Sequence, residues 1–321
     1  MKIYHRSLIA IMAVVLFICM CPGLAVAAGQ KGFETPEKAV STFISAMKSK
    51  DMQGLMGIFG EAGEDLIYSG DPVSDKQRFE MFVAAYDAKT SIARDGDTAV
   101  LIVGEADWPF PIPLVKEKGL WIFAVESGKE EILNRRVGEN ELNTIQTLLA
   151  VVDAQREYAM HDHDNDNLLE YAEKFQSDPG KKNGLYWKTE PDEKPSPLGE
   201  LMAQAWSEGY TFDGSHAGPR PFHGYYFKML TGQGANAPGG EFDYIVNGNM
   251  IGGFALIAHP ATYGNSGIMT FIVNHRGMVY EKDLGEDTEN KIKKITAFDP
   301  DEIWQPVMNE TDERNMKGKN Q

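Results

Sequence analysis

One acidic run in the middle of the chain has the residue types and the spacing of a calcium-binding loop. Asp162, Asp164 and Asp166 place carboxylates at positions 1, 3 and 5 of such a twelve-residue loop, and Glu173 occupies position 12, which normally supplies a bidentate carboxylate. Leu168 would add its backbone carbonyl at position 7. Because neighbouring carboxylates repel one another and a hard cation prefers oxygen ligands, we expect this loop to bind calcium.

Two features of the run leave alternatives open. Asn167 stands at position 6, where glycine is usual, although asparagine also tolerates the left-handed conformation. The run could instead be a solvated acidic turn that caps a helix, which we expect over 170–175. His161 and His163 could supply nitrogen ligands to a transition metal, which is a less favoured alternative. Calcium is therefore the favoured ion.

The elements that must position this loop form a predicted C-terminal α+β unit over 129–308. The longest helical pattern covers 129–161, and Leu142, Ile145, Leu149 and Val152 mark its expected buried stripe. A second helix is expected over 198–207. Asn274–Gly277 has the composition of a hairpin turn in which glycine takes a positive φ. Strands are expected over 225–230, 242–246, 253–258, 268–273 and 278–283.

A smaller α+β unit is predicted over 28–128. Thr35 is the expected N-cap of its first helix, with Pro36 at the first helical position. The apolar residues that follow at helical spacing predict one buried face: Val40, Phe43, Ile44 and Met47. Further helices are expected over 51–59 and 77–86, and strands over 98–103, 108–115 and 120–125. The predicted fold class is therefore α+β in two units, followed by a disordered tail over 309–321 that has no apolar face.

Residues 1–27 have the pattern of a secretory signal peptide. Lys2 and Arg6 precede an apolar run over 8–19, and Ala25 and Ala27 are small residues before the expected cleavage site. The alternative is an uncleaved anchor helix, but the run is shorter than the ~20 residues that a spanning helix needs. We therefore expect an exported protein, periplasmic or extracellular, with no stable membrane anchor after cleavage.

Both cysteines of the chain, Cys19 and Cys21, lie in this leader. Ile18 and Met20 precede them, so neither has the small neighbour that a lipid-modified cysteine needs. The mature chain is expected to have no disulfide. An exported protein without disulfides depends on its apolar core or on a bound metal for stability.

The composition excludes several classes of protein. The 321 residues include 31 Lys and Arg against 47 Asp and Glu, a net charge of −16 that becomes −18 once Lys2 and Arg6 are removed. Such an acidic chain is a poor match for a nucleic-acid backbone, so no nucleic-acid partner is expected. A hydrophobic content of 42% excludes general disorder.

No group of residues forms a catalytic motif. Ser266 lies between two glycines but lacks the spacing of a nucleophile elbow, and we interpret it as part of a turn between strands. No catalytic residue is therefore assigned. The favoured function is a non-catalytic binding or envelope-associated module, with an unknown ligand or envelope partner and a structural calcium loop. The alternative is a secreted hydrolase with a site between the two units, for which His223, His259 and Ser266 are the candidates.

Blocks of residues along the chain include Trp108–Val115, Glu130–Arg136, Asp153–Tyr158, Glu170–Ala172, Gly184–Trp187, His223–Tyr226, Met250–Ala255 and Met269–Asn274. Together these blocks resemble an exported bacterial family catalogued as domain of unknown function 2950. The resemblance extends from Phe33 to Val307 and implies no activity, cofactor or catalytic residue. In outline, the second half also resembles the globular part of pseudopilins, with a long helix, an acidic loop and an antiparallel sheet that ends in a hairpin.

Overall fold

The structure, a computed structural model, describes residues 30–190, 192–211 and 220–307. It divides into two compact units. Unit 1 consists of the chain up to Tyr68 together with Asp75–Asn134, and unit 2 consists of Ser69–Ser74 together with the chain from Arg135 onwards. The predicted leader and tail, and both cysteines, lie outside the described residues.

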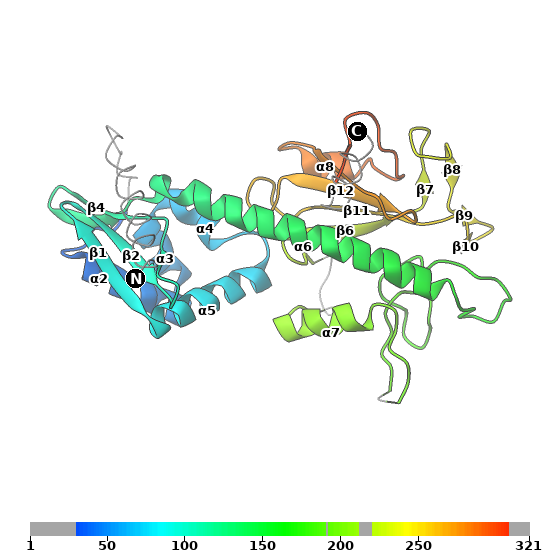
Figure 1. Ribbon diagram of the computed structural model, residues 1–321, viewed down its shortest axis with the longest axis horizontal. Helices are drawn as coiled ribbons and strands as arrows, with labels where there is room; N and C mark the ends of the chain where they lie inside the picture. Colours follow the sequence, from blue (N-terminus) through cyan, green and yellow to red (C-terminus); the bar gives the residue numbers. More distant parts are fainter. Residues whose placement is uncertain (1–29, 191, 212–219, 308–321) are drawn as a thin grey trace, which may run out of the picture. The chain divides into compact units, whose positions relative to one another are not determined.

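Unit 1 packs helices on an antiparallel sheet, which confirms the α+β class for this part of the chain (Figure 1). The sheet has the order β1-β2-β4-β5, and β3 pairs with β2 at its side. The helical segments are α2 (Pro36–Ser49), α3 (Met52–Phe59), η2 (Glu61–Gly63), α4 (Glu64–Ile67), α5 (Pro72–Ala88) and η3 (Val125–Ser127). The strands are β1 (Thr90–Asp95), β2 (Thr98–Val103), β3 (Trp108–Pro109), β4 (Leu114–Glu117) and β5 (Leu120–Phe123).

The start and the buried face of α2 are as predicted. The Thr35 side chain accepts a hydrogen bond from the backbone N–H of Lys38 at 3.2 Å, and Pro36 is the first helical residue. The predicted apolar face is buried, and the Phe43 ring makes an edge contact with Phe123 on β5 with 5.4 Å between centroids. These aromatic contacts give unit 1 its core.

Unit 2 combines a long helix with a second antiparallel sheet, which confirms the α+β class here as well (Figure 1). The sheet order is β14-β13-β12-β11-β6, and two short hairpins, β7-β8 and β9-β10, stand beside it. The predicted hairpin between β12 and β13 is present, with Gly277 at φ +81°. The helices are α6 (Lys129–Tyr158), α7 (Gly199–Glu208) and α8 (Thr288–Ile292). The strands are β6 (Tyr225–Leu230), β7 (Gly232–Gln233), β8 (Phe242–Asp243), β9 (Ile245–Val246), β10 (Asn249–Met250), β11 (Ala255–Pro260), β12 (Met269–Asn274), β13 (Val279–Asp283) and β14 (Gln305–Pro306).

The predicted buried stripe of α6 is wrong in part. Leu142 is 63% exposed and Leu149 is 40% exposed, whereas Val152 is buried. The buried face lies to one side of the predicted one, and it mixes apolar residues such as Leu148 and Val151 with polar ones. The buried polar residues are Arg136, Asn140, Thr144, Thr147 and Gln155. A search for apolar spacing could not find this face because half of it is polar.

The buried polar residues of α6 hold the loop before β12. The Asn140 side-chain amide donates to the Ser266 carbonyl at 2.8 Å. Glu141 Oε1 accepts from the backbone N–H groups of Ile268 and Met269, each at 2.9 Å. The Arg136 guanidinium donates to the Asn265 side-chain oxygen. The bonds of Asn140 and Glu141 pair backbone groups of Ser266, Ile268 and Met269 that would otherwise lack a partner under the helix.

Within the described ranges, no helix is both long enough and apolar enough to span a bilayer.

Candidate functional site

The acidic loop begins at Asp162, four residues after the end of α6 at Tyr158, and hydrogen bonds from its own side chains shape it. Asp162 Oδ1 accepts from the backbone N–H of Asn165 at 2.7 Å, and Asp162 Oδ2 accepts from that of Asn167 at 2.9 Å. Asp166 Oδ1 accepts from the N–H of Leu168 at 2.8 Å. Asn165 and Asn167 have φ of 65° and 69°, so asparagine takes the left-handed conformation that glycine usually provides. The loop is a tight turn, as predicted.

Three carboxylates converge on this turn. Asp162, Asp164 and Asp166 each offer one ligand oxygen, and these oxygens lie within 4.8 Å of one another. Asp162 is half-buried and the other two are exposed. The backbone N–H groups of Asn167 and its neighbours hold the pKa of Asp162 below its usual range. The carboxylate therefore stays ionised, in the form that a cation needs.

Glu170 is an acidic neighbour that the sequence analysis did not single out. Burial, and next the charges of Asp164 and Asp166, raise the pKa of its carboxyl. The backbone N–H of Met250 donates to the same carboxyl. Position 9 of a calcium loop, which Glu170 occupies when Asp162 is position 1, often contributes through water, and this spacing could have identified it. Glu173 is exposed and lies outside the group formed by the three aspartates.

The helix expected over 170–175 is wrong. The chain is not helical there, and Leu169 is 57% exposed rather than packed. Tertiary hydrogen bonds replace the helical ones. The Gln155 side chain on α6 donates to the Ala172 carbonyl at 2.7 Å and accepts from the Ala172 N–H at 2.9 Å, and the Tyr171 N–H donates to Met250 at 2.9 Å. The backbone that leaves the loop is therefore fixed at both α6 and β10.

The two histidines of the run pack rather than converge on the aspartates. The His163 ring stacks on Tyr158 with 4.1 Å between centroids, and its Nε2 lies 3.1 Å from the Tyr158 carbonyl oxygen. Burial lowers the pKa of His163. Neither His161 nor His163 belongs to the group of close ligand atoms found among the described residues.

The candidates for a hydrolase have structural contacts. Ser266 is fully buried, and its Oγ accepts from the Thr262 N–H at 2.9 Å and donates to the Thr262 carbonyl at 3.2 Å. His259 Nδ1 lies 3.1 Å from the carbonyl oxygen of Pro260, and burial lowers the pKa of this imidazole. His223 Nε2 lies 3.3 Å from the Glu208 carboxylate. Ser266 is therefore part of a turn, as interpreted from the sequence.

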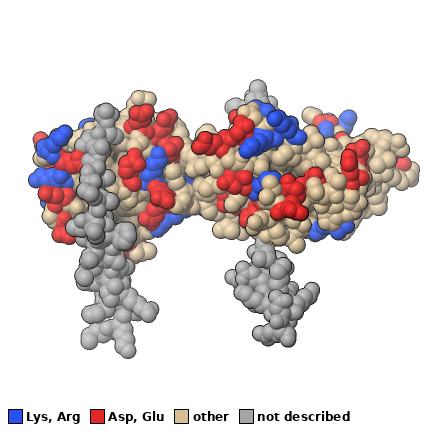
Figure 2. Space-filling model, turned by 90° about the horizontal axis from the view of Figure 1, so that it is seen from above, with Lys and Arg blue, Asp and Glu red and all other residues tan. Residues whose placement is uncertain are grey.

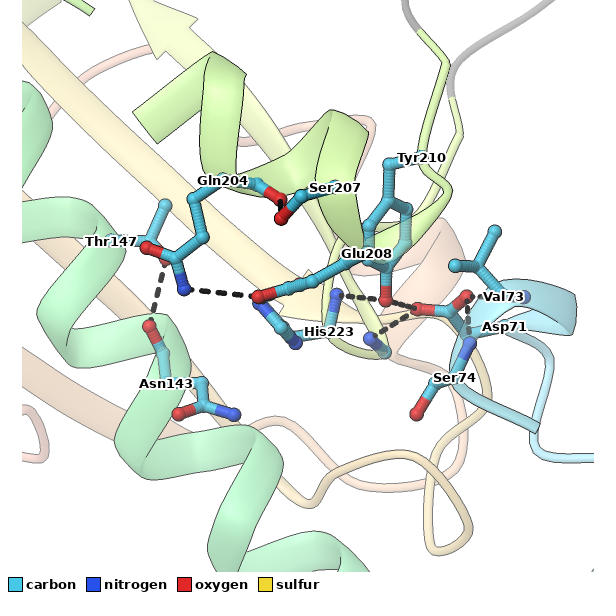
Figure 3. A network of polar contacts seen from close by, with 11 residues as sticks. Asp71, Val73, Ser74, Asn143, Thr147, Gln204, Ser207, Glu208, Tyr210 and His223 are labelled. Carbon is cyan, nitrogen blue, oxygen red and sulfur yellow. Dashed lines mark hydrogen bonds and ion pairs between the residues drawn. The ribbon is translucent and has the colours of Figure 1, made fainter. Parts of the chain in front are cut away.

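A second polar cluster, shown in Figure 3, joins three segments of unit 2 that are distant in sequence. Asp71 Oδ2 accepts from the Tyr210 hydroxyl and from the Gly224 N–H, each at 2.9 Å. The Tyr210 oxygen in turn accepts from the His223 N–H at 3.1 Å. Gly224 has φ +77°, and a Cβ there would collide with the Asn140 side chain. This cluster was not predicted from the sequence, although Asp71 directly before Pro72 is a helix-start pattern.

Comparison with known proteins identifies a family of unknown function. The family model described as "Protein of unknown function (DUF2950)" matches residues 30–307, so the resemblance found in the sequence is confirmed. No curated protein and no solved structure matches the chain. The likeness to pseudopilins stays a prediction.

Proposed function

Since the chain belongs to a family of unknown function, DUF2950, we propose a function from its own residues. The protein is an exported, non-catalytic binding or envelope-associated module, and its acidic loop is a structural calcium site. One observation carries the calcium part: the ligand oxygens of Asp162, Asp164 and Asp166 lie within 4.8 Å of one another. A divalent cation offsets the mutual repulsion of three carboxylates at this spacing.

The proposed ligand set extends beyond the three aspartates. The Leu168 carbonyl supplies a fourth oxygen, and Glu173 supplies a carboxylate from the segment that leaves the loop. Glu170, whose charge interacts with those of Asp164 and Asp166, is an additional or replacing ligand. Oxygen ligands of this kind, six to eight in number with water included, are typical of calcium.

The proposed role of the ion is to join the end of α6 to the segment that follows. Tyr158 is buried at one side of the loop, and Ala172 is buried against Gln155 at the other. An ion between them binds the folded chain and not the unfolded one, so it stabilises unit 2 by mass action. Millimolar calcium outside the cell matches the weak sites of extracellular modules.

Export is the part of the proposal that rests on residues 1–27 alone. The positive residues, the short apolar run and the Ala25–Ala27 box support cleavage before Ala28. We expect the intact mass of the protein recovered from the periplasm or the medium to begin at Ala28. A mass that includes Met1 in that fraction would contradict cleavage.

The calcium site is tested by thermal unfolding. We expect the Tm of the full chain, freed of metal by a chelator, to rise by about three degrees in about 10 mM calcium, because a ligand at about ten times its Kd contributes about 1.4 kcal/mol. Asp162→Asn should abolish the shift, since Asp162 organises the turn and offers a ligand oxygen.

Asp95→Asn is the matched control. Asp95 is exposed in unit 1 at the end of β1, and its substitution removes the same charge. This variant should keep the full calcium shift. An unchanged Tm in calcium for the unsubstituted chain, or an equal shift in Asp162→Asn, would refute the site.

A further inference from the structure

Unit 2 contains a largely apolar cavity of about 240 Å³, none of whose lining residues belongs to the acidic loop. One wall is α6, which contributes Thr147 and Val151. The opposite wall is α7, which contributes Leu201, Met202 and Ala205. Aromatic rings close the remaining sides: Phe175, Tyr186, Phe222 and Phe227. Pockets with such a lining and a few polar groups are the usual form of small-molecule sites.

Arg220 gives the cavity its single charge among the described lining residues. The side chain is half-buried, and its Nη1 donates to the Thr211 hydroxyl at 2.5 Å. A guanidinium has five N–H donors in a planar fork, so it can also hold a carboxylate. In a chain of net charge −16, a cavity lined by a cation and by no described acidic residue favours an anion.

The volume limits the size of the occupant. A dry cavity of about 150 Å³ holds benzene, which has six non-hydrogen atoms. By proportion, this cavity holds roughly ten non-hydrogen atoms. The polar lining groups are few: apart from Arg220, they are the side chains of Gln176, Thr147 and Tyr186. Thr147 already donates to the Asn143 carbonyl at 2.8 Å. A sugar or a nucleotide would leave most of its polar groups unpaired here.

We propose that this cavity binds a small apolar monocarboxylate, such as octanoate or phenylacetate. The apolar tail lies between α6 and α7, against Val151, Met202 and Ala205. The carboxylate accepts hydrogen bonds from Arg220. This assignment gives the proposed binding module a ligand class and rests on that function, but it involves none of the calcium ligands.

The test is calorimetric titration of octanoate into the full chain, with octanol and octylamine as matched probes. We expect octanoate to bind about fivefold more tightly than octanol, because only the carboxylate makes charge-assisted hydrogen bonds with the partly exposed Arg220. Octylamine should not bind measurably. Absence of binding by octanoate at millimolar concentration would overturn the proposal, as would equal affinity for all three probes.

Methionine methyl groups locate the ligand without any substitution. In a chain with ¹³C-labelled methionine methyls, octanoate should shift the Met202 signal, because Met202 lines the cavity. The Met47 signal should stay unchanged, because Met47 is buried in the core of unit 1. Binding that shifts Met47 and not Met202 would place the ligand elsewhere and refute this site.

Two variants distinguish the contribution of the Arg220 charge to octanoate binding from that of the cavity volume. Arg220→Gln should weaken octanoate about fivefold and leave octanol unaffected, a loss of the size expected for one partly exposed charge pair. Ala205→Phe should fill the cavity and abolish the binding of octanoate and of octanol. The control Arg94→Gln removes an exposed arginine of unit 1 and should bind octanoate normally.

The calcium site and the carboxylate-binding cavity can each be refuted independently of the other. Octanoate binding should be the same in calcium and in chelator, since no ligand of the loop lines the cavity. Loss of the calcium shift with octanoate binding intact would refute the clamp alone. Absence of octanoate binding with the calcium shift intact would refute the ligand class alone.

Discussion

Asp71 is 1% exposed, and its carboxylate accepts hydrogen bonds at both oxygens (Figure 3). Oδ1 accepts from the N–H groups of Val73 at 3.1 Å and Ser74 at 3.2 Å, which begin α5. Oδ2 accepts from Tyr210 and Gly224 in the part of the chain after α7. Burial and the Asp71 charge raise the pKa of the Tyr210 hydroxyl, so the phenol remains a donor. One side chain thereby caps a helix and fixes a distant loop.

We expect Asp71→Ala to lower the free energy of unfolding by about 3 kcal/mol, because it leaves several buried donors without an acceptor. Tyr210→Phe, which removes the hydrogen bond to Asp71 and the one from the His223 N–H, should cost about 2 kcal/mol. Both are measured by urea denaturation.

Asp51→Ala provides the comparison. Asp51 caps α3 from the surface by accepting from the Gly54 N–H at 2.9 Å, and its loss should cost about 1 kcal/mol. If Asp71→Ala cost no more than Asp51→Ala, the buried network would not have the importance assigned to it.

At the scale of an element, α6 shows that a buried helix face need not be apolar. Gln155 is fully buried, and its amide makes two hydrogen bonds to the backbone of Ala172. Asn140 and Glu141 make equivalent bonds to the loop before β12. Leu142, on the same helix, is largely exposed. The helix is therefore held by directed polar contacts as well as by packing.

For these two positions of α6, we expect an apolar substitution to destabilise the protein more than a polar one. Gln155→Leu should lower the free energy of unfolding by about 2 kcal/mol, because the Ala172 N–H and C=O lose their partners inside the protein. Leu142→Gln should change it by no more than about 0.5 kcal/mol, as expected for a surface position. Chemical denaturation of the two variants checks both values. A larger loss in free energy of unfolding for Leu142→Gln than for Gln155→Leu would mean that Leu142 is packed, as the stripe predicted from the sequence requires.

The sequence predicted elements whose causes are local. The Thr35 cap and the Asn274–Gly277 hairpin depend on residues within a few positions, and both are present. β1 was missed because Thr90–Asp95 is polar at its ends. Gly96, at φ +57° in the two-residue turn to β2, was the signal that could have found it.

The wrong predictions concern segments whose conformation depends on residues that are distant in sequence. The segment after the acidic loop avoids the helical state because Gln155 and Met250 bond its backbone. No local pattern contains that information. At the site, the three aspartates were predictable from spacing, whereas the nearness of Glu170 became visible only in the folded chain.

At the scale of the whole molecule, the ionisable side chains make the stability depend on pH. On the face drawn in Figure 2, acidic and basic side chains are interspersed in both units. Burial lowers the pKa of three histidines of unit 2: His163, His259 and His275. The folded state therefore favours their neutral forms, and acid opposes folding through them.

We expect the free energy of unfolding to fall as pH decreases below about 6.5, the ordinary histidine pKa, toward the lower values of the folded state. Above that range the contribution is constant, because the imidazoles are neutral in both states. His259 is affected chiefly by burial, and the charges of Glu289 and Lys228 act on it with opposite signs.

His259→Gln should reduce the slope of stability against pH between about 5 and 7, the range in which an ordinary histidine titrates. Urea denaturation in chelator at several pH values measures it. A steeper slope in the variant would mean that His259 is stabilised in its charged form instead.

The segment Ser69–Ser74 belongs to unit 2, although unit 1 precedes and follows it in the chain. Asp71 and its partner Tyr210 are 139 residues apart. At a synthesis rate of about 5–20 residues per second, Asp71 emerges on the order of ten seconds before Tyr210 exists. Unit 1 can thus complete its core during synthesis, whereas the Asp71 carboxylate stays hydrated until the rest of unit 2 has been made. The position of one short segment imposes an order of folding on the whole chain.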